Sequence, residues 1–251
     1  MSIPAKSLKW YRQLSDKKGR LAANAFLVEG AKAIRQIVAG HPEAISEILS
    51  VEEPPALFHK YPARIVTASQ FRYISSTQTP QGIMALVKTP EDIYSSKLPE
   101  DAGKRILLLE DIQDPGNVGA LIRTAAALNY SGVILTESCA DPLSPKCVQA
   151  SAGTVLSVWL RRTAQYLEIV RALKNDGYTL IAADVRGDDK PSILSRQKKL
   201  ALALGNEAAG LTPETLSIAD YRVRIPTAPE KAESLNVAAC GAILMYLSPG
   251  K

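Results

Sequence analysis

The chain has 251 residues, 46% of them hydrophobic, and a formal net charge of +5. This length predicts one or two domains, and the hydrophobic fraction excludes a disordered protein. No apolar run approaches the roughly 20 residues that cross a bilayer. Residues 1–9 are polar and basic and lead into no apolar stretch, so they do not resemble a secretory signal. We therefore expect a cytoplasmic protein with no membrane partner.

Cysteine and histidine are too sparse for several kinds of site. Cys139, Cys147 and Cys240 are too few and too scattered for a disulfide framework or a zinc site. His41 lies in a Gly-His-Pro turn and His59 follows two prolines. The sequence also has no P-loop and no G-x-S-x-G elbow. We expect no metal ion and no Ser-His-Asp hydrolase.

Positive charge is concentrated near the N-terminus. Residues 1–36 hold eight basic side chains and two acidic ones, a surplus of six that exceeds that of the whole chain. Trp10, Tyr11 and Phe26 lie among these charges, and basic side chains beside aromatic rings suit phosphate contacts and base stacking. A solvated helix face with a few core aromatics explains the pattern equally well.

The first ninety residues alternate between strand and helix patterns. Hydrophobic periodicity predicts helices over 5–14, 31–39 and 69–75, and strands over 26–28, 45–51, 64–67 and 82–88. Residues 89–104 contain two prolines, a glycine and several charges without an apolar period, which is typical of a linker. We therefore divide the chain into a domain over 1–90, a linker over 91–104 and a domain over 105–251.

The sequence of the second domain predicts a doubly wound α/β fold with a parallel sheet. Apolar strands are expected over 105–109, 132–136, 179–183, 200–204 and 221–225, and helices over 117–128, 145–150, 167–175 and 235–247. Strands without polar alternation, separated by helices, are typical of a parallel sheet covered on both faces. Ligands in such folds bind beyond the carboxyl ends of the strands.

Three polar clusters follow these predicted strands, and each has an ordinary structural explanation. In the first cluster, over 114–123, Asn117 is a suitable helix cap and Arg123 a solvated side chain. The second, over 205–211, is a glycine-rich bend before a helix that starts near Thr212-Pro213. In the third, Ile225-Pro226 is followed by Ser234, a possible cap for the last helix. Together, the clusters are expected on one rim of one sheet.

In order and spacing, the three clusters resemble the signature motifs of the SpoU (TrmH) family of RNA ribose methyltransferases in the SPOUT superfamily. The matching residues are Asn117, Gly119 and Arg123 in the first motif, Gly205, Glu207 and Gly210 in the second, and Ile225-Pro226 with Ser234-Leu235-Asn236 in the third. The first domain resembles the ribosomal-protein-like substrate-binding domain of that family, in Phe26–Gly30 and Thr79–Ile83. Residues 227–233 depart from the family pattern, because the family has methionine and glycine after Ile-Pro.

The resemblance implies a knotted α/β catalytic domain and a homodimer with its active site near the subunit interface. It also implies S-adenosylmethionine as cofactor, bound near Gly205, Ile225 and Leu235, and a ribose 2′-hydroxyl of RNA as methyl acceptor. Arg123, Asn117, Glu207, Ser234 and Asn236 are the implied catalytic residues. We expect Asn117 and Glu207 to hold Arg123 in place, and Ser234 and Asn236 to position the ribose or the cofactor. Since a guanidinium has a pKa above about 12, we expect Arg123 to act as a fixed cation on the 2′-oxygen rather than as a base.

Three alternatives stay open. The substrate is expected to be ribosomal RNA, because the first domain resembles the ribosomal branch of the family, with transfer RNA as the alternative. A non-catalytic RNA-binding protein would use both domains as a scaffold. A nucleotide-dependent oxidoreductase is disfavoured because no G-x-G fingerprint follows the first strand of the second domain.

Overall fold

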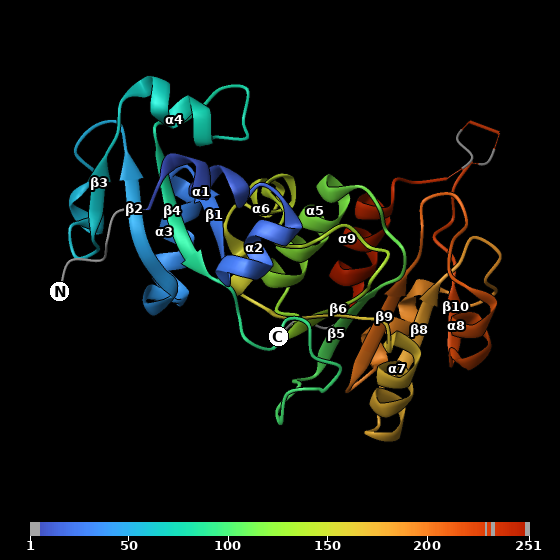
Figure 1. Cartoon of the computed structure of the whole chain (residues 1–251). Coiled ribbons are helices and arrows are strands. Elements are labelled where there is room, and N and C mark those ends of the chain that lie inside the picture. Colours follow the sequence, from blue (N-terminus) through green and yellow to red (C-terminus); the bar gives the residue numbers. More distant parts are fainter. Residues whose placement is uncertain (1–5, 229, 232–233, 249–251) are drawn as a thin grey trace. The chain divides into compact units, whose positions relative to one another are not determined.

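The computed structural model describes residues 6–228, 230–231 and 234–248, which form two compact units (Figure 1). The first unit comprises the chain up to Pro90 together with Asp141–Ser157. The second comprises Glu91–Ala140 and the chain from Val158 onward. Each unit has its own sheet and its own buried core.

The sheet of the first unit has the strand order β1-β4-β2-β3. Strand β4 (Ile83–Lys88) pairs antiparallel with both β1 (Ala25–Glu29) and β2 (Ile45–Ser50), whereas β2 and β3 (Ala63–Ile65) are parallel. The helices are α1 (Leu8–Gln13), α2 (Lys17–Ala23), α3 (Ala31–Gly40) and α4 (Ala68–Ile74), with short 3-10 helices η1 (Pro42–Ala44) and η2 (Ala56–Phe58). The sequence did not predict α2, because the helix has only seven residues and includes Gly19, which weakens the helical pattern.

The segment Asp141–Ser157 lies within the sequence of the second domain but packs in the first unit. Its helices α6 (Pro145–Ala150) and η3 (Thr154–Leu156) contact β1 and α3. Gly153 has a φ of +86°, and a Cβ there would stand 2.4 Å from the carbonyl oxygen of Ala33, so this close approach requires glycine. The contacts thus group 141–157 with the first unit, whereas the division proposed from sequence keeps them in 105–251.

A buried ion pair joins this segment to α2. Arg20 donates to Oδ2 of Asp141 at 2.6 Å, and the two side chains are only 4% and 9% exposed. Arg20 also donates to the carbonyl oxygens of Leu14 and Ser15, at 3.1 and 2.8 Å. One guanidinium therefore donates to three acceptors from two distant parts of the chain.

The sheet of the second unit is entirely parallel, as the sequence predicted. Its strand order is β10-β8-β9-β5-β6-β7. The strands are β5 (Arg105–Leu109), β6 (Gly132–Thr136), β7 (Trp159–Thr163), β8 (Thr179–Ala183), β9 (Leu200–Leu204) and β10 (Tyr221–Val223). The helices are α5 (Pro115–Ala127), α7 (Tyr166–Asn175), α8 (Pro213–Ile218), α9 (Val237–Leu247) and the 3-10 helix η4 (Pro191–Arg196). In the part of the chain that the structure describes, no helix is long and apolar enough to span a bilayer.

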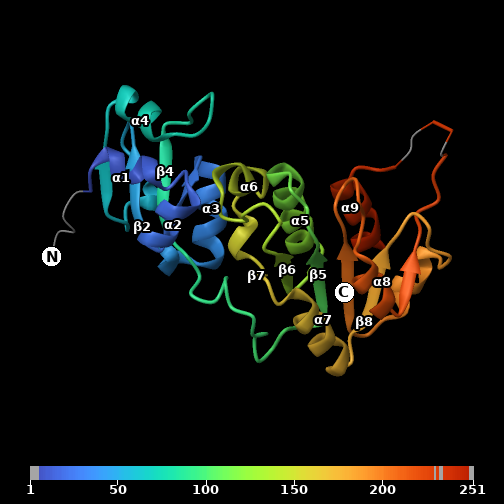
Figure 2. The same cartoon turned by 45° about the vertical axis from the view of Figure 1, so that its right-hand side comes forward.

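Helices cover both faces of this sheet. On one face, Ile106 and Leu108 of β5 share a core with Ile169 and Leu173 of α7. On the other face, α5 and α9 lie side by side (Figure 2). A Cβ on Gly241 of α9 would approach Leu204 of β9 to 2.7 Å. Burial of each such leucine or isoleucine stabilises the unit by about 1.5–3 kcal/mol.

Strand β7 was not predicted, because its sequence Trp-Leu-Arg-Arg-Thr looks polar. Both arginines are nevertheless buried. Arg161 donates to the carbonyl oxygen of Lys97 at 2.7 Å and forms an ion pair of 2.5 Å with Asp92. Arg162 donates to the carbonyl oxygens of Glu137 and Cys139. Backbone acceptors from neighbouring loops thus make two arginines tolerable in a buried strand.

Replacing Arg20 with methionine should destabilise the protein by about 3–5 kcal/mol, because Asp141 would remain as a buried charge without its partner. The free energy of unfolding, measured by urea denaturation and circular dichroism, checks this value. Arg72→Met is the matched control, since Arg72 is exposed on α4 of the same unit, and it should change stability by less than about 0.5 kcal/mol. Equal effects of the two substitutions would show that the Arg20 ion pair contributes nothing specific.

Candidate functional site

The carboxyl ends of the strands in the second unit meet at one edge, because all neighbouring strands are parallel. Polar residues follow four of these ends. Asp111 comes two residues after β5, Asp184 directly after β8, Asn206 two residues after β9, and Arg224 directly after β10. The loops that carry the three sequence motifs therefore converge where ligands of α/β sheets bind.

Asn117 is hydrogen-bonded to the other two motifs. Its Nδ2 donates to Oε1 of Glu207 at 2.9 Å, and its Oδ1 accepts from Nδ2 of Asn236 at 3.0 Å. These partners are 90 and 119 residues away in sequence. The structure thus brings together Asn117, Glu207 and Asn236, which we call the amide–carboxylate trio.

Helix capping leaves the Asn117 side chain available for this role. Asp114, not Asn117, caps α5, accepting from the backbone N–H of Asn117 at 2.8 Å. Asn236 caps α9 and accepts from the backbone N–H groups of Ala238 and Ala239. Ser234, the cap considered from sequence, lies two residues before the true cap. Capping fixes the Asn236 amide, so its Nδ2 has a defined direction toward Asn117.

The loop after β9 is closed on itself. Asn206 and Gly210 exchange two backbone hydrogen bonds of 3.0 and 2.9 Å, and a Cβ on Gly205 would stand 2.2 Å from the carbonyl carbon of Gly210. Asn206 also donates from Nδ2 to the carbonyl oxygen of Asp111 at 2.9 Å. Sequence analysis missed Asn206, although its position directly beyond a buried strand was a usable signal. The loop is therefore preformed and tied to the end of β5.

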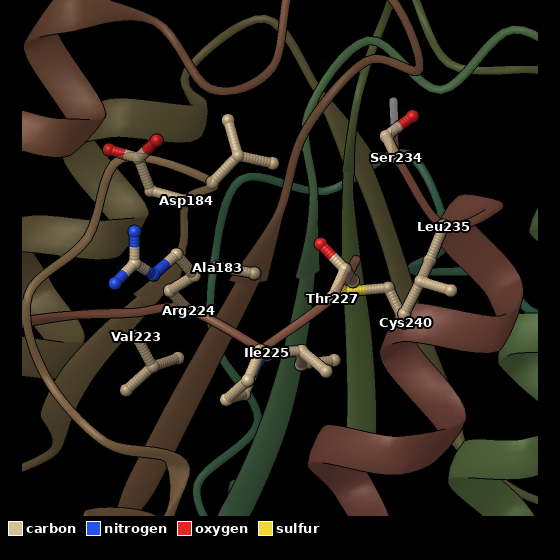
Figure 3. Close-up of a pocket in the computed structure, with 11 residues that line it drawn as sticks. Ala183, Asp184, Val223, Arg224, Ile225, Thr227, Ser234, Leu235 and Cys240 are labelled. Atoms are coloured by element: carbon tan, nitrogen blue, oxygen red, sulfur yellow. The ribbon is translucent and has the colours of Figure 1, made fainter. Parts of the chain in front are cut away.

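A cavity of about 490 Å³ opens beside this edge (Figure 3). Figure 3 shows Asp184 and Arg224 on one side and Leu235 and Cys240 on the other, with Thr227 between them. A second cavity of about 600 Å³ overlaps the first and extends along the loop 205–211. Asp184, Leu235 and Cys240 are among the lining residues that the two cavities share. The remaining residues of the first cavity are Ala183, Val185, Val223, Ile225, Pro226 and Ser234.

Asp184 lines both cavities, and its carboxylate is paired with Arg222. Burial raises the pKa of its carboxyl group, but the Arg186 backbone N–H and the Arg222 guanidinium outweigh burial and lower that pKa below its ordinary value. Arg222 donates from Nε to Oδ2 of Asp184 at 3.0 Å, and the carboxylate is only 7% exposed. The contribution of Asp184 to stability is therefore present at neutral pH and lost as pH falls through its lowered pKa.

Cys240 of α9 lines both cavities and was not expected there from sequence. Burial raises the pKa of its thiol to about 11. The side chain is consequently a neutral, weakly polar part of the wall at physiological pH.

The structure brings most of the predicted site residues together but leaves Arg123 apart from them. The trio of Asn117, Glu207 and Asn236 is joined by hydrogen bonds, and Ile225, Ser234 and Leu235 line the first cavity. Gly205 lines the second cavity. Arg123 is exposed on α5, and within residues 6–228, 230–231 and 234–248 it has no hydrogen bond or ion pair. The expectation that Asn117 and Glu207 hold Arg123 is therefore wrong, because six residues at 100° each set Arg123 about 120° from Asn117 around the helix axis.

The loop that departs from the family pattern is only partly described. Thr227 lines the first cavity, and residues 229, 232 and 233 lie outside the described part of the chain. Among the described residues, no group of three histidine, cysteine, aspartate or glutamate side chains is arranged to hold a metal ion. The site therefore offers fixed amides, carboxylates and an apolar wall as its chemical groups.

Comparison with known proteins matches both halves of the chain. The model of the SpoU rRNA methylase family matches residues 104–246, and that of an MRM3-like substrate-binding domain matches residues 5–85. An uncharacterised tRNA/rRNA methyltransferase of Synechocystis is 30% identical, covering 95% of this chain and 89% of that protein. The 23S rRNA (guanosine(2553)-2′-O)-methyltransferase RlmP of Bacillus subtilis is 29% identical over 98% of this chain and 96% of its own.

Among solved structures, the SpoU methyltransferase AviRb from Streptomyces viridochromogenes, in complex with AdoMet, has a TM-score of 0.82 and 26% identity. It covers 96% of this chain and 95% of its own. The resemblance inferred from the three motifs is thereby confirmed over the whole chain. The protein belongs to the SpoU rRNA methylase family and is an S-adenosylmethionine-dependent RNA methyltransferase.

Proposed function

We propose that the chain transfers a methyl group from S-adenosylmethionine to a ribose 2′-hydroxyl of ribosomal RNA. The observation that carries this proposal is the amide–carboxylate trio, which joins all three family motifs beside the two cavities. Similarity to the B. subtilis 2′-O-methyltransferase and the matched substrate-binding domain support this acceptor.

The two cavities suit the cofactor. Their volumes of about 490 and 600 Å³ lie in the range of about 300–1,000 Å³ usual for small-molecule sites. Val185, Ile225 and Leu235 offer apolar surface for a flat adenine ring, and Asp184 offers an anionic acceptor at the same wall. When bound, the cofactor supplies a methyl group on a positively charged sulfur. We assign Gly205, Ile225 and Leu235 to its binding, and add Asp184 and Cys240, which the sequence did not single out.

We assign the acceptor side of the site to the catalytic residues expected from sequence. The trio holds the start of α5, the loop after β9 and the start of α9 in one geometry, which positions Ser234 and Asn236 for contact with the ribose. Arg123 is not engaged by the trio, so its guanidinium is available to the RNA. A permanent cation there would stabilise negative charge that develops on the 2′-oxygen, whereas proton abstraction by a guanidinium would be costly.

Methyl transfer should be detected with purified protein, labelled S-adenosylmethionine and undermodified ribosomal RNA, followed by mass-spectrometric mapping of ribose methylation. Arg123→Ala should lower the transfer rate by about 10²–10³, the usual loss when one charge donor to the reacting oxygen is removed. Arg123→Lys should retain part of the activity, because the charge stays while the planar fork is lost. Cofactor affinity should be unchanged in both variants.

Three outcomes separate the alternatives. Methylation of transfer RNA but not ribosomal RNA would show that the substrate is transfer RNA. Binding of RNA without any methyl transfer would favour a non-catalytic scaffold. Wild-type turnover of Arg123→Ala would remove Arg123 from the mechanism.

Cys240 gives a direct test of the cofactor position. Because its thiol pKa is raised to about 11, alkylation by iodoacetamide should be slow at pH 8 and accelerate by about tenfold per pH unit up to that pKa. S-adenosylmethionine should protect Cys240, as measured by peptide mass spectrometry. Cys139 and Cys147 are buried and serve as internal controls that should stay unlabelled. Unprotected Cys240 at a saturating cofactor concentration would place the cofactor elsewhere.

We further propose that the protein is a homodimer and that its catalytic domain has the knotted topology of the family. An exposed apolar stripe on α9 supports the dimer: Ile243 is 41%, Tyr246 76% and Leu247 39% exposed. The similarity to the AviRb structure supports the knot. The expected cytoplasmic location and the absence of a metal requirement stay predictions.

Ile243→Glu together with Leu247→Glu should convert the dimer to a monomer, because two carboxylates would be buried in an apolar interface. Light scattering after size-exclusion chromatography measures the mass. Leu57→Glu with Ile65→Glu is the matched control, since both residues are exposed in the first unit, and it should leave the mass unchanged. A monomeric wild-type protein at micromolar concentration would refute the dimer.

A further inference from the structure

Helices α1 and α4 of the first unit pack against each other (Figures 1 and 2). Segments 6–15 and 63–75, which contain these helices, include no acidic residue. Their five cations are Lys6, Lys9, Arg12, Arg64 and Arg72. We call the exposed surface of these five residues, with Trp10 and Tyr73, the α1–α4 face.

Aromatic rings on this face are stacked with cations. The Arg12 guanidinium carbon lies 4.9 Å from the ring centroid of Tyr73, and Lys6 Nζ lies 3.8 Å from that of Trp10. Arg12 also donates to the backbone carbonyl of Tyr73, which ties α1 to α4. Tyr73 is nevertheless 45% exposed. A ring and a guanidinium are thus held together at the surface with much of the ring open to solvent.

This arrangement differs from the grouping suggested by sequence. Tyr11 and Phe26, which lie among the N-terminal charges, are fully buried, and Arg20 is occupied in the ion pair with Asp141. The exposed aromatic ring beside these charges is instead that of Tyr73, which lies sixty-three residues after Trp10 in the chain. The charge surplus therefore contains a structural part and an exposed part, and only the exposed part is available to a ligand.

We propose that the α1–α4 face binds unpaired nucleotides of the RNA substrate, with bases stacked on Tyr73 and the Arg12 guanidinium and with phosphates near Lys9 and Arg72. This inference rests on the proposed function, because it assigns part of the substrate to a second surface of the same protein. Aromatic rings and guanidinium planes are the groups on which unstacked bases lie. An A-form duplex hides its base faces, so a surface of this kind gains little from paired RNA.

The test uses the full-length protein and a short fluorescein-labelled oligouridine, with a duplex of equal length for comparison. Fluorescence anisotropy gives the affinity between about 50 and 200 mM salt. Tyr73→Leu should weaken oligouridine binding by about tenfold and leave both duplex binding and the salt dependence unchanged. Tyr73→Phe should restore the wild-type affinity, since it keeps the ring.

The charged residues require a different readout. Lys9→Gln with Arg72→Gln should lower the slope of log affinity against log salt by about 0.7 for each charge removed. Lys32→Gln with Arg35→Gln is the matched control: it removes the same charge from exposed positions of α3 and should leave the slope unchanged. Thermal denaturation verifies that each variant is folded.

Two results would overturn the proposal. One is wild-type oligouridine affinity in Tyr73→Leu, or equal losses on oligouridine and duplex. The other is an effect on polyglutamate binding as large as that on oligouridine, which would assign the face to acidic proteins. If either result is obtained while the wild-type protein methylates ribosomal RNA, the proposed function stands without this surface. If the face binds oligouridine as expected but no methyl transfer occurs, the proposed function alone fails.

Discussion

The parallel arrangement of the six strands in the second unit is the constraint on which the site depends. Parallel pairing places the carboxyl ends of β5, β8, β9 and β10 at one edge, although the loops that follow them are spread over more than one hundred residues of sequence. Each of these loops is then fixed locally, by a helix cap or by a closed turn. The hydrogen bonds among Asn117, Glu207 and Asn236 connect loops that the sheet has already brought close.

Much of this architecture was predictable, because four strands of the second unit are short and almost entirely apolar runs. Strands 105–109, 132–136, 179–183 and 200–204 agree with the structure residue for residue. The three motif loops were also placed correctly at the strand ends. Their mutual hydrogen bonds were not predictable, since the side chain of Asn117 had an equally good local use as a helix cap. Only the structure shows that Asp114 takes the cap and leaves the Asn117 amide for long-range contacts.

The failures of sequence analysis have a common physical origin, which is burial of charge through partners that are distant in sequence. Strand β7 was missed because Arg161 and Arg162 find their acceptors in loops up to sixty-nine residues away. Arg20 was counted with an RNA-binding surplus, whereas Asp141 neutralises it inside the first unit. Local patterns report the propensity of a segment, but they do not report which buried charges will be compensated. Cavity residues such as Cys240 were missed for a related reason. No local sequence motif distinguishes a residue that lines a cavity from one in the ordinary core.

The placement of residues 141–157 in the first unit has a consequence for biosynthesis. During translation, β1, α2 and α3 leave the ribosome long before the segment that completes their packing. Arg20 has no carboxylate partner until Asp141 is made, so the ion pair between them cannot form in a chain interrupted before that point. By then β5 and β6 of the second unit have also been synthesised. The nascent first unit therefore cannot complete its native core until Ser157 has been synthesised, when part of the second unit has already left the ribosome or lies within it.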